Sequence, residues 1–189
     1  PEYGIIGIAG TTDLIDGRWW TLKESMNGIV SHQHEGKKWT NYYSKDQGKT
    51  ITEMVALDGL FFAIDKTKIK HTFDEDFHGF HFYDISFCFP NYLDGVKIGL
   101  TTFIRITHLS IGQTNQQWEG HKLRFEEKYK DKLPVRLTSN KTFDEKLKFN
   151  DFFLRNWGRI RIAPGGGRER ERGGRYPEIF NVELGKCST

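Results

Sequence analysis

The stretch FDEDFHGFHFYDISF, residues 73–87, decides which fold we expect for this chain. Aromatic and apolar side chains at positions 80, 83 and 87, and again at 85, 89 and 92, recur at the spacing of a helix face. We therefore expect a helix over residues 80–93 that is interrupted near Pro90, because proline lacks the N–H that a helix interior uses. Asp84 then lies in the early turns among apolar positions, where a carboxylate needs a specific reason to face inward.

Strand patterns lie on both sides of this helix. We expect strands at 4–9, in a hairpin over 28–43 with its turn at Glu35-Gly36, at 51–56 and 60–64 around Asp58-Gly59, and at 96–107. A second helix is expected over 113–130, where four residues repeat every three or four positions: Trp118, His121, Phe125 and Tyr129. The order of these elements predicts an α/β fold, with a mixed sheet and flanking helices.

Composition restricts the class of protein. A length of 189 residues corresponds to about one domain. The composition, with 37% hydrophobic and 28% charged residues, excludes a disordered, collagenous or coiled-coil chain. Two cysteines exclude a disulfide scaffold or a cysteine-rich zinc site. No apolar stretch reaches the length of a membrane helix, so we expect a cytoplasmic protein.

Charge is unevenly distributed along the chain. The segment from Arg155 to Arg175 contains seven arginines and two glutamates, which gives it a local charge of +5. Because the net charge of the chain is +3, the remaining residues carry a charge of −2. Arginine charge in this segment raises nucleic-acid binding as a possibility, but the alternating Arg-Glu pattern favours a solvated loop.

The acidic run Asp74-Glu75-Asp76 has two interpretations. Together with Asp84 it places carboxylates among aromatic residues, which shift carboxyl pKa values and suit general acid or base chemistry. The plainer interpretation is an acidic approach to a helix N-terminus, which the helix dipole favours without any catalysis.

Histidines and tryptophans also allow two interpretations. His32 and His34 share one face of a strand, a spacing that a metal pair uses, although an exposed strand edge is the plainer explanation. His108 ends an apolar strand, at the kind of sheet edge where α/β sites form. Three tryptophans offer faces for sugar stacking, with core packing as the default: Trp19, Trp20 and Trp39.

Several segments in order then resemble a known family. They are Gly7–Gly10, Leu57–Ile64, Phe73–Glu75, Gly79–Phe87, Gly95–Gly99, Ile106–Ser110 and Phe125–Tyr129. Over residues 4–134 the chain resembles the C-terminal, acceptor-side half of a GT-A glycosyltransferase of the family 2-like group. The nucleotide-binding half and its Asp-x-Asp motif would lie upstream of Gly4, so the resemblance implies a GT-A fold that is incomplete at the N-terminus.

The resemblance implies roles for individual residues. Asp84 falls on the general base of inverting transfer, and His108 falls on a ligand of a divalent metal, Mn²⁺ or Mg²⁺. Ser86 stands where the family often carries a second acid. We assign the acceptor side of the site to six further residues: Asp58, Gly59, Glu75, Tyr83, Trp19 and Trp20.

We accordingly expect a GT-A-like domain over 1–134 and an extension over 135–189 that contains the Gly/Arg-rich loop 164–175. The expected function is metal-dependent, inverting transfer of a sugar from a nucleotide-sugar donor to a glycan or other acceptor, with contact to a membrane only through the acceptor. Two alternatives stay open. One is a glycoside hydrolase that uses Glu75 and Asp84, and the other is a non-catalytic module that binds carbohydrate or nucleic acid.

Overall fold

The computed structural model describes residues 2–44, 51–109, 112, 114–137, 142–143 and 180–184. Its strands are β1 (Ile5–Gly7), β2 (Ala9–Thr11), β3 (Asp13–Leu14), β4 (Met26–His34), β5 (Lys37–Tyr42), β6 (Ile51–Met54), β7 (Ala56–Leu57), β8 (Ala63–Ile64), β9 (Ile98–Leu100), β10 (Ile104–His108), β11 (Val135–Arg136), β12 (Thr142–Phe143) and β13 (Phe180–Leu184). Its helices are α1 (Tyr83–Leu93) and α2 (Gln116–Lys128), with short 3-10 turns η1 (Lys23–Ser25) and η2 (Glu75–Phe77). The mixed α/β class is confirmed by this arrangement.

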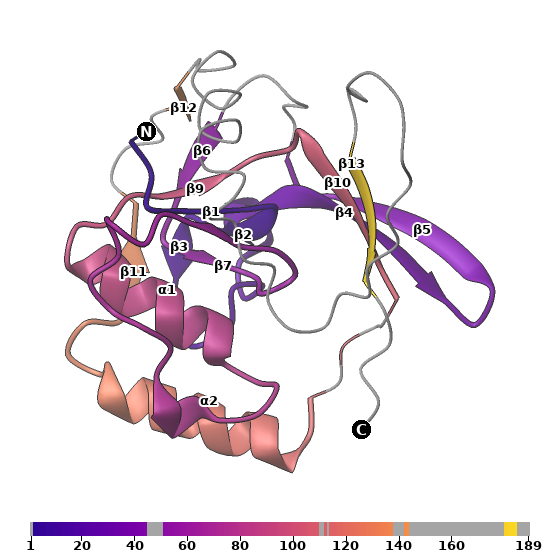
Figure 1. The fold of residues 1–189 in the computed structure, drawn as a ribbon. Coiled ribbons are helices and arrows are strands. Elements are labelled where there is room, and N and C mark those ends of the chain that lie inside the picture. Colours follow the sequence, from indigo (N-terminus) through magenta and orange to yellow (C-terminus); the bar gives the residue numbers. More distant parts are fainter. Residues whose placement is uncertain are drawn as a thin grey trace.

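Two mixed sheets organise the described residues (Figure 1). The first has the strand order β12-β6-β9-β1-β8, and the second has the order β13-β10-β4-β2-β7, with β5 on β4. Parallel pairing joins β1 to β9, and β10 to both β4 and β13. The other pairs are antiparallel, including the small β11-β3 ribbon.

The chain passes from one sheet to the other at single residues. Ile8 separates β1 from β2, and Val55 separates β6 from β7, so the expected strands 4–9 and 51–56 are each divided between the sheets. The single strand expected over 96–107 is also wrong. The backbone N–H of Phe103 donates to Thr101 Oγ1 at 3.2 Å, and this bend sends β9 and β10 into different sheets.

The hairpin expected over 28–43 is confirmed by β4 and β5, which pair antiparallel from Ile29–Tyr42 to His34–Lys37. Its turn residues Glu35 and Gly36 have φ angles of 47° and 76°. Positive φ at both central residues matches the twist of a two-residue hairpin. The turn was therefore correctly located from the sequence.

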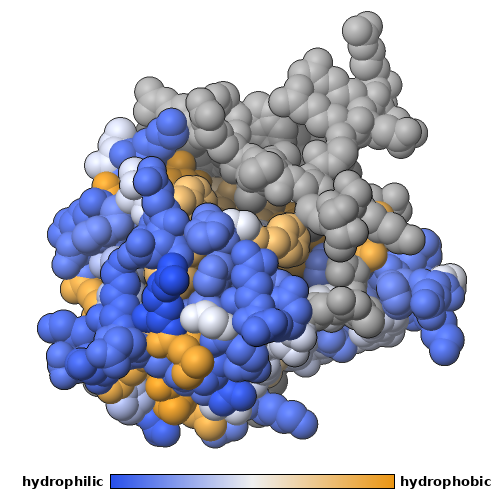
Figure 2. Space-filling view, turned by 90° about the horizontal axis from the view of Figure 1, so that it is seen from below, coloured by the Kyte–Doolittle hydropathy of each residue, from blue (hydrophilic) through white to orange (hydrophobic). Residues whose placement is uncertain are grey.

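The two helices lie on the same side of the sheets (Figure 1). The α1 helix packs on β7, and α2 packs on α1, where the ring of Phe125 lies 5.6 Å from Phe89 and 5.9 Å from Phe82. The expected second helix is confirmed within its predicted range, and the side chain of Asn115 caps it by accepting from the N–H of Trp118. Seen from the helix side, the surface is largely hydrophilic with a few hydrophobic areas (Figure 2).

The first helix ends at Leu93 as predicted, but it differs from its prediction at its start and at Pro90. It begins at Tyr83 rather than at 80, because Phe82 has a left-handed φ of 65°. It also continues through Pro90 to Leu93, so the expected interruption was wrong. Next to Pro90, the buried side chain of Asn91 adds a hydrogen bond within the same turn, since its Nδ2 donates to the carbonyl oxygen of Phe87 at 2.9 Å.

The described parts of the expected extension contribute edge strands. β11 pairs with β3, β12 with β6, and β13 with β10. The Gly/Arg-rich loop 164–175 lies outside the described residues. Within the part that is described, no helix is long and apolar enough to cross a membrane.

We predict a large difference between alanine substitutions at two glycines of the β4–β5 hairpin. Both have positive φ, but a Cβ on Gly28 would lie 2.2 Å from the carbonyl oxygen of Ile8, whereas a Cβ on Gly36 meets nothing within 4 Å. Gly28→Ala should lower the free energy of unfolding by about 3 kcal/mol and Gly36→Ala by about 1 kcal/mol. Urea unfolding measures both, and equal losses would show that the contact with Ile8 is not limiting.

Candidate active site

Two carboxylates, those of Asp58 and Asp84, lie where β7 ends and α1 begins. Asp58 follows β7 directly, and Asp84 is the second residue of α1. The backbone N–H of Gly59 donates to Asp84 Oδ2 at 2.9 Å, and the Tyr83 hydroxyl donates to the carbonyl oxygen of Gly59 at 2.9 Å. These two bonds fix the turn after β7 against the first turn of the helix.

Asp84 is oriented by backbone groups. Besides the N–H of Gly59, its carboxylate accepts the N–H of Ile85 at 2.8 Å. It also lies in the first turn of α1, where the helix dipole favours negative charge. Hydrogen bonds from backbone N–H groups at the start of the helix therefore explain why an acid is tolerated among these apolar positions.

Gly59 brings the turn close to the helix. A Cβ at this position would lie 2.2 Å from the Tyr83 hydroxyl oxygen, so a larger residue would break the contact that places Asp84. The structure thus brings together four of the residues assigned to the site from the sequence: Asp58, Gly59, Tyr83 and Asp84.

Removal from water raises the pKa values of both carboxylates. Removal from water, followed by the charge of Asp84, raises the pKa of Asp58 to about 7, against the opposing hydrogen bonds from Leu60 and Trp19. Burial also raises the pKa of Asp84, which the N–H groups of Ile85 and Gly59 oppose. Asp84 accepts backbone N–H groups at 2.8 and 2.9 Å, whereas Asp58 accepts that of Leu60 at 3.2 Å. We therefore assign the first ionisation to Asp84, and Asp58 keeps its proton to about neutral pH.

The two adjacent tryptophans have different environments. Trp19 is buried, with 7% of its surface exposed, and its indole donates to the Asp58 carboxylate, so core packing and positioning explain it. Trp20 is 41% exposed and lies edge-on to Trp19 at 6.0 Å and 5.9 Å from the ring of Trp118. Trp39 stacks on His32 instead, at 5.1 Å.

His108 lies opposite His32 on the neighbouring strand, and their rings are 5.6 Å apart. Burial, followed by the proximity of His32, lowers the pKa of His108 to about 4. A cavity of about 260 Å³, lined by residues of β4, β5 and β10, lies beside His32. His34, expected as the partner of His32, is instead 3.6 Å from Glu35.

The histidine pair does not by itself fit Mn²⁺ or Mg²⁺. Imidazole nitrogens can bind metal ions, but Mn²⁺ and Mg²⁺ prefer oxygen ligands, and among the described side chains no third His, Cys, Asp or Glu joins His32 and His108. Among the described residues, no group of three or more His, Cys, Asp or Glu side chains is arranged to hold a metal.

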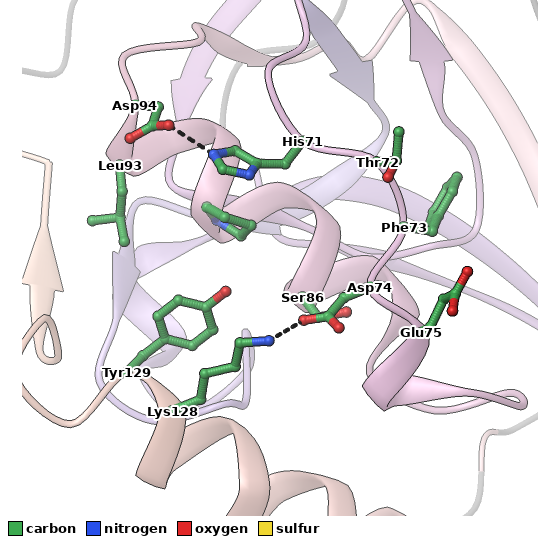
Figure 3. Close-up of a pocket in the computed structure, with 11 residues that line it drawn as sticks. His71, Thr72, Phe73, Asp74, Glu75, Ser86, Leu93, Asp94, Lys128 and Tyr129 are labelled. Carbon is green, nitrogen blue, oxygen red and sulfur yellow. Dashed lines mark hydrogen bonds and ion pairs between the residues drawn. The ribbon is translucent and has the colours of Figure 1, made fainter.

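Glu75 lies apart from the Asp58–Asp84 pair. It is exposed on η2 and lines a cavity of about 600 Å³ that α1 and the end of α2 also line (Figure 3). Asp74 begins η2 by accepting the N–H of Asp76 at 3.1 Å, and it pairs with Lys128 at 2.6 Å. The plainer interpretation of the acidic run thus applies to η2, not to α1.

Sequence reasoning missed two features of the site. Asp58 was assigned only to the acceptor side, whereas it is the electrostatic partner of Asp84. The hydrogen-bonded row beside it was also missed, in which the Asn41 amide donates to the Tyr43 hydroxyl at 2.9 Å and lies 3.2 Å from His32 Nε2. The position of Asp58 directly after a buried strand was a signal that the sequence offered for its role. The hydrogen-bonded row of Asn41, Tyr43 and His32 depends on the register between strands, which the sequence does not show.

Comparison with known proteins gives one match. Residues 1–135 match the profile of a family described as "Glycosyltransferase like family". A search of curated proteins and a search of solved structures found no match. The matched residues cover β1 to the start of β11, and therefore include every residue discussed at the site.

We predict that Asp58→Asn stabilises the protein progressively as pH rises. With a folded-state pKa of about 7 against 3.8, wild-type Asp58 resists ionisation that the unfolded chain undergoes, so the free energy of unfolding falls between pH 4 and 7. Asparagine cannot ionise, so the variant does not lose this stability. The difference in free energy of unfolding between Asp58→Asn and wild type should therefore be about 2 kcal/mol more favourable to the variant at pH 8 than at pH 4.

The matched control is Asp65→Asn, because the hydrogen bonds of Thr67 lower the pKa of Asp65. Its stability relative to wild type should stay level between pH 5 and 8. Urea unfolding across this pH range measures both variants. A level difference for Asp58→Asn as well would mean that Asp58 ionises freely in the folded protein.

Proposed function

The chain belongs to this glycosyltransferase-like family, and from that membership we propose that it transfers a sugar from a nucleotide-sugar donor to a hydroxyl of a glycan or other acceptor, with inversion at the anomeric carbon. The observation that supports the proposal is the carboxylate of Asp84, held by the N–H groups of Gly59 and Ile85 beside a second, half-buried acid, Asp58.

In the proposed reaction Asp84 is the general base. Its carboxylate takes the proton of the acceptor hydroxyl while that oxygen forms a bond to the anomeric carbon. The bond between the anomeric carbon and the diphosphate breaks, and the nucleoside diphosphate leaves from the opposite face with the electron pair. One proton moves to Asp84, and no other group is consumed.

Asp58 supports this role electrostatically. While it keeps its proton, the pair carries one negative charge rather than two, and that charge resides on Asp84. Burial raises the pKa of Asp84 as well, and a more basic carboxylate is a better acceptor for the proton of an attacking hydroxyl. The indole of Trp19 fixes Asp58 in this position.

The acceptor is proposed to bind over the exposed part of the site. Trp20 presents a partly exposed indole beside Trp19, and an aromatic face suits the C–H face of a sugar ring. A cytoplasmic location, with contact to a membrane only through the acceptor, belongs to the same proposal.

His108 stays the proposed ligand of a divalent metal, Mn²⁺ or Mg²⁺. A bound metal would neutralise the charge of the departing diphosphate. Since the described residues add only the imidazole of His32, no step of the transfer is assigned to the metal.

The geometry favours transfer over hydrolysis by Glu75 and Asp84. The acid adjacent to Asp84 is Asp58, whose pKa is raised by the charge of Asp84, whereas Glu75 is exposed and lines a separate cavity. The nucleic-acid alternative depends on the arginine-rich segment, which lies outside the described residues.

We predict that Asp84→Asn lowers the transfer rate by roughly 10²–10⁴-fold, because an amide cannot accept the proton of the acceptor hydroxyl. Release of nucleoside diphosphate from a panel of UDP-, GDP- and dTDP-sugars, with glycan acceptors, measures the rate. Asp65→Asn, which alters an acid bonded to Thr67, should retain wild-type turnover. Full activity of Asp84→Asn would exclude Asp84 as the base.

The same assay tests the protonation of the base. We predict that the wild-type rate rises with pH as Asp84 loses its proton, at a pH above the usual carboxyl range because burial raises its pKa. A profile that is level from pH 4 to 8 would contradict this assignment.

A further inference from the structure

The cavity of about 600 Å³ beside α1 is separate from the carboxylate pair. Three residues on one face of α1 line it, namely Ser86, Pro90 and Leu93, at helical spacing. Its other walls come from the segment 71–75 and from the end of α2 (Figure 3). The volume falls within the roughly 300–1,000 Å³ of sites for small molecules.

A buried hydroxyl in this wall lacks a partner. Ser86 has 0% of its surface exposed, and its Oγ makes no hydrogen bond. A buried hydroxyl without a partner destabilises a protein by about 1–3 kcal/mol, so such a group calls for an explanation. Because Ser86 also belongs to the lining of the cavity, a ligand that penetrates far enough to reach Oγ would supply the missing partner.

Four ionisable side chains at the cavity already lie in two pairs. The imidazole of His71 lies 2.7 Å from Asp94, and the ammonium of Lys128 lies 2.6 Å from Asp74, as the dashed lines in Figure 3 show. Glu75 adds a further carboxylate to the lining. Acids therefore outnumber bases, which disfavours an anionic ligand, while carboxylate oxygens can accept hydrogen bonds from hydroxyl groups.

The rest of the lining suits a ligand with both apolar and hydroxyl faces. Pro90, Leu93 and the ring of Tyr129 are apolar, and the hydroxyls of Tyr129 and Thr72 belong to the same lining. Figure 3 shows the Tyr129 ring and Lys128 across from Asp74 and Ser86. A sugar ring has C–H faces for the apolar side chains and hydroxyls for the polar ones.

We propose that this cavity binds an uncharged sugar unit of the acceptor, at a subsite distinct from Asp58 and Asp84. The inference rests on the proposed function, because the acceptor is taken to be a glycan. Ser86 and Tyr129 are its specificity-determining hydroxyls, and the carboxylates of Asp74 and Glu75 accept hydrogen bonds from the ligand.

Nuclear magnetic resonance titration of the full chain with neutral saccharides tests the proposal. The probes are methyl glucoside, methyl galactoside, N-acetylglucosamine and their β-linked disaccharides, with glucose 6-phosphate and glucuronate as anionic probes. At least one neutral probe should shift amide signals of residues 71–75 and 86–94, and both anionic probes should bind more weakly. No shifts there with any neutral probe up to about 50 mM, or tighter binding of an anionic probe, would overturn the proposal.

Matched variants locate the binding. Ser86→Ala and Tyr129→Phe should each raise the Kd of the neutral probe by about 3- to 10-fold, since each removes one hydrogen bond. Ser86→Ala should not lower Tm, because its hydroxyl has no partner in the folded protein. Thr67→Ala, a hydroxyl outside the cavity, should leave the Kd unchanged. Wild-type Kd values in both cavity variants would overturn the proposal.

Asp84→Asn separates this inference from the proposed function. The variant should keep the wild-type Kd for the neutral probe while it loses transfer. If the wild-type protein binds the neutral probe but has no transferase activity, the sugar site is upheld and the proposed enzymatic function is rejected. If Asp84→Asn abolishes binding and Ser86→Ala leaves it intact, the sugar binds at the carboxylate pair, and the proposed subsite is overturned.

Discussion

Two hydrogen bonds at Gly59 hold the candidate site together. Its N–H donates to Asp84, and its carbonyl oxygen accepts from Tyr83, so one residue connects the end of β7 to the start of α1 in both directions. The approach is so close that a side chain at this position would overlap Tyr83. The relation of helix to sheet, the place of Asp84 and the proximity of Asp58 all depend on this contact.

That contact explains why two acids are tolerated in a largely buried place. Asp84 has backbone donors and a helix N-terminus, while Asp58 has an indole and a backbone N–H and keeps its proton to about neutral pH. The arrangement supplies one ionised carboxylate with limited access to water. A base for an acceptor hydroxyl needs this combination.

Local patterns in the sequence were sufficient where structure is local. The hairpin turn at Glu35-Gly36 and the helix over 116–128 follow from turn chemistry and periodicity. The division of 96–107 between two sheets did not, since it depends on which distant strands β9 and β10 pair with. The candidate site divides in the same way: Asp84 was predicted from its motif and helical position, whereas its electrostatic effect on Asp58 depends on the tertiary contact between β7 and α1.

Asn91 shows how order near the cavity is achieved. Its amide donates to the carbonyl oxygens of Phe87 and His71, and its Oδ1 accepts the N–H groups of Lys70 and His71. One buried side chain thus makes four hydrogen bonds to backbone groups and anchors residues 70–71 to α1. The conformational entropy of this wall is lost during folding, so a molecule that settles against it meets a preorganised surface.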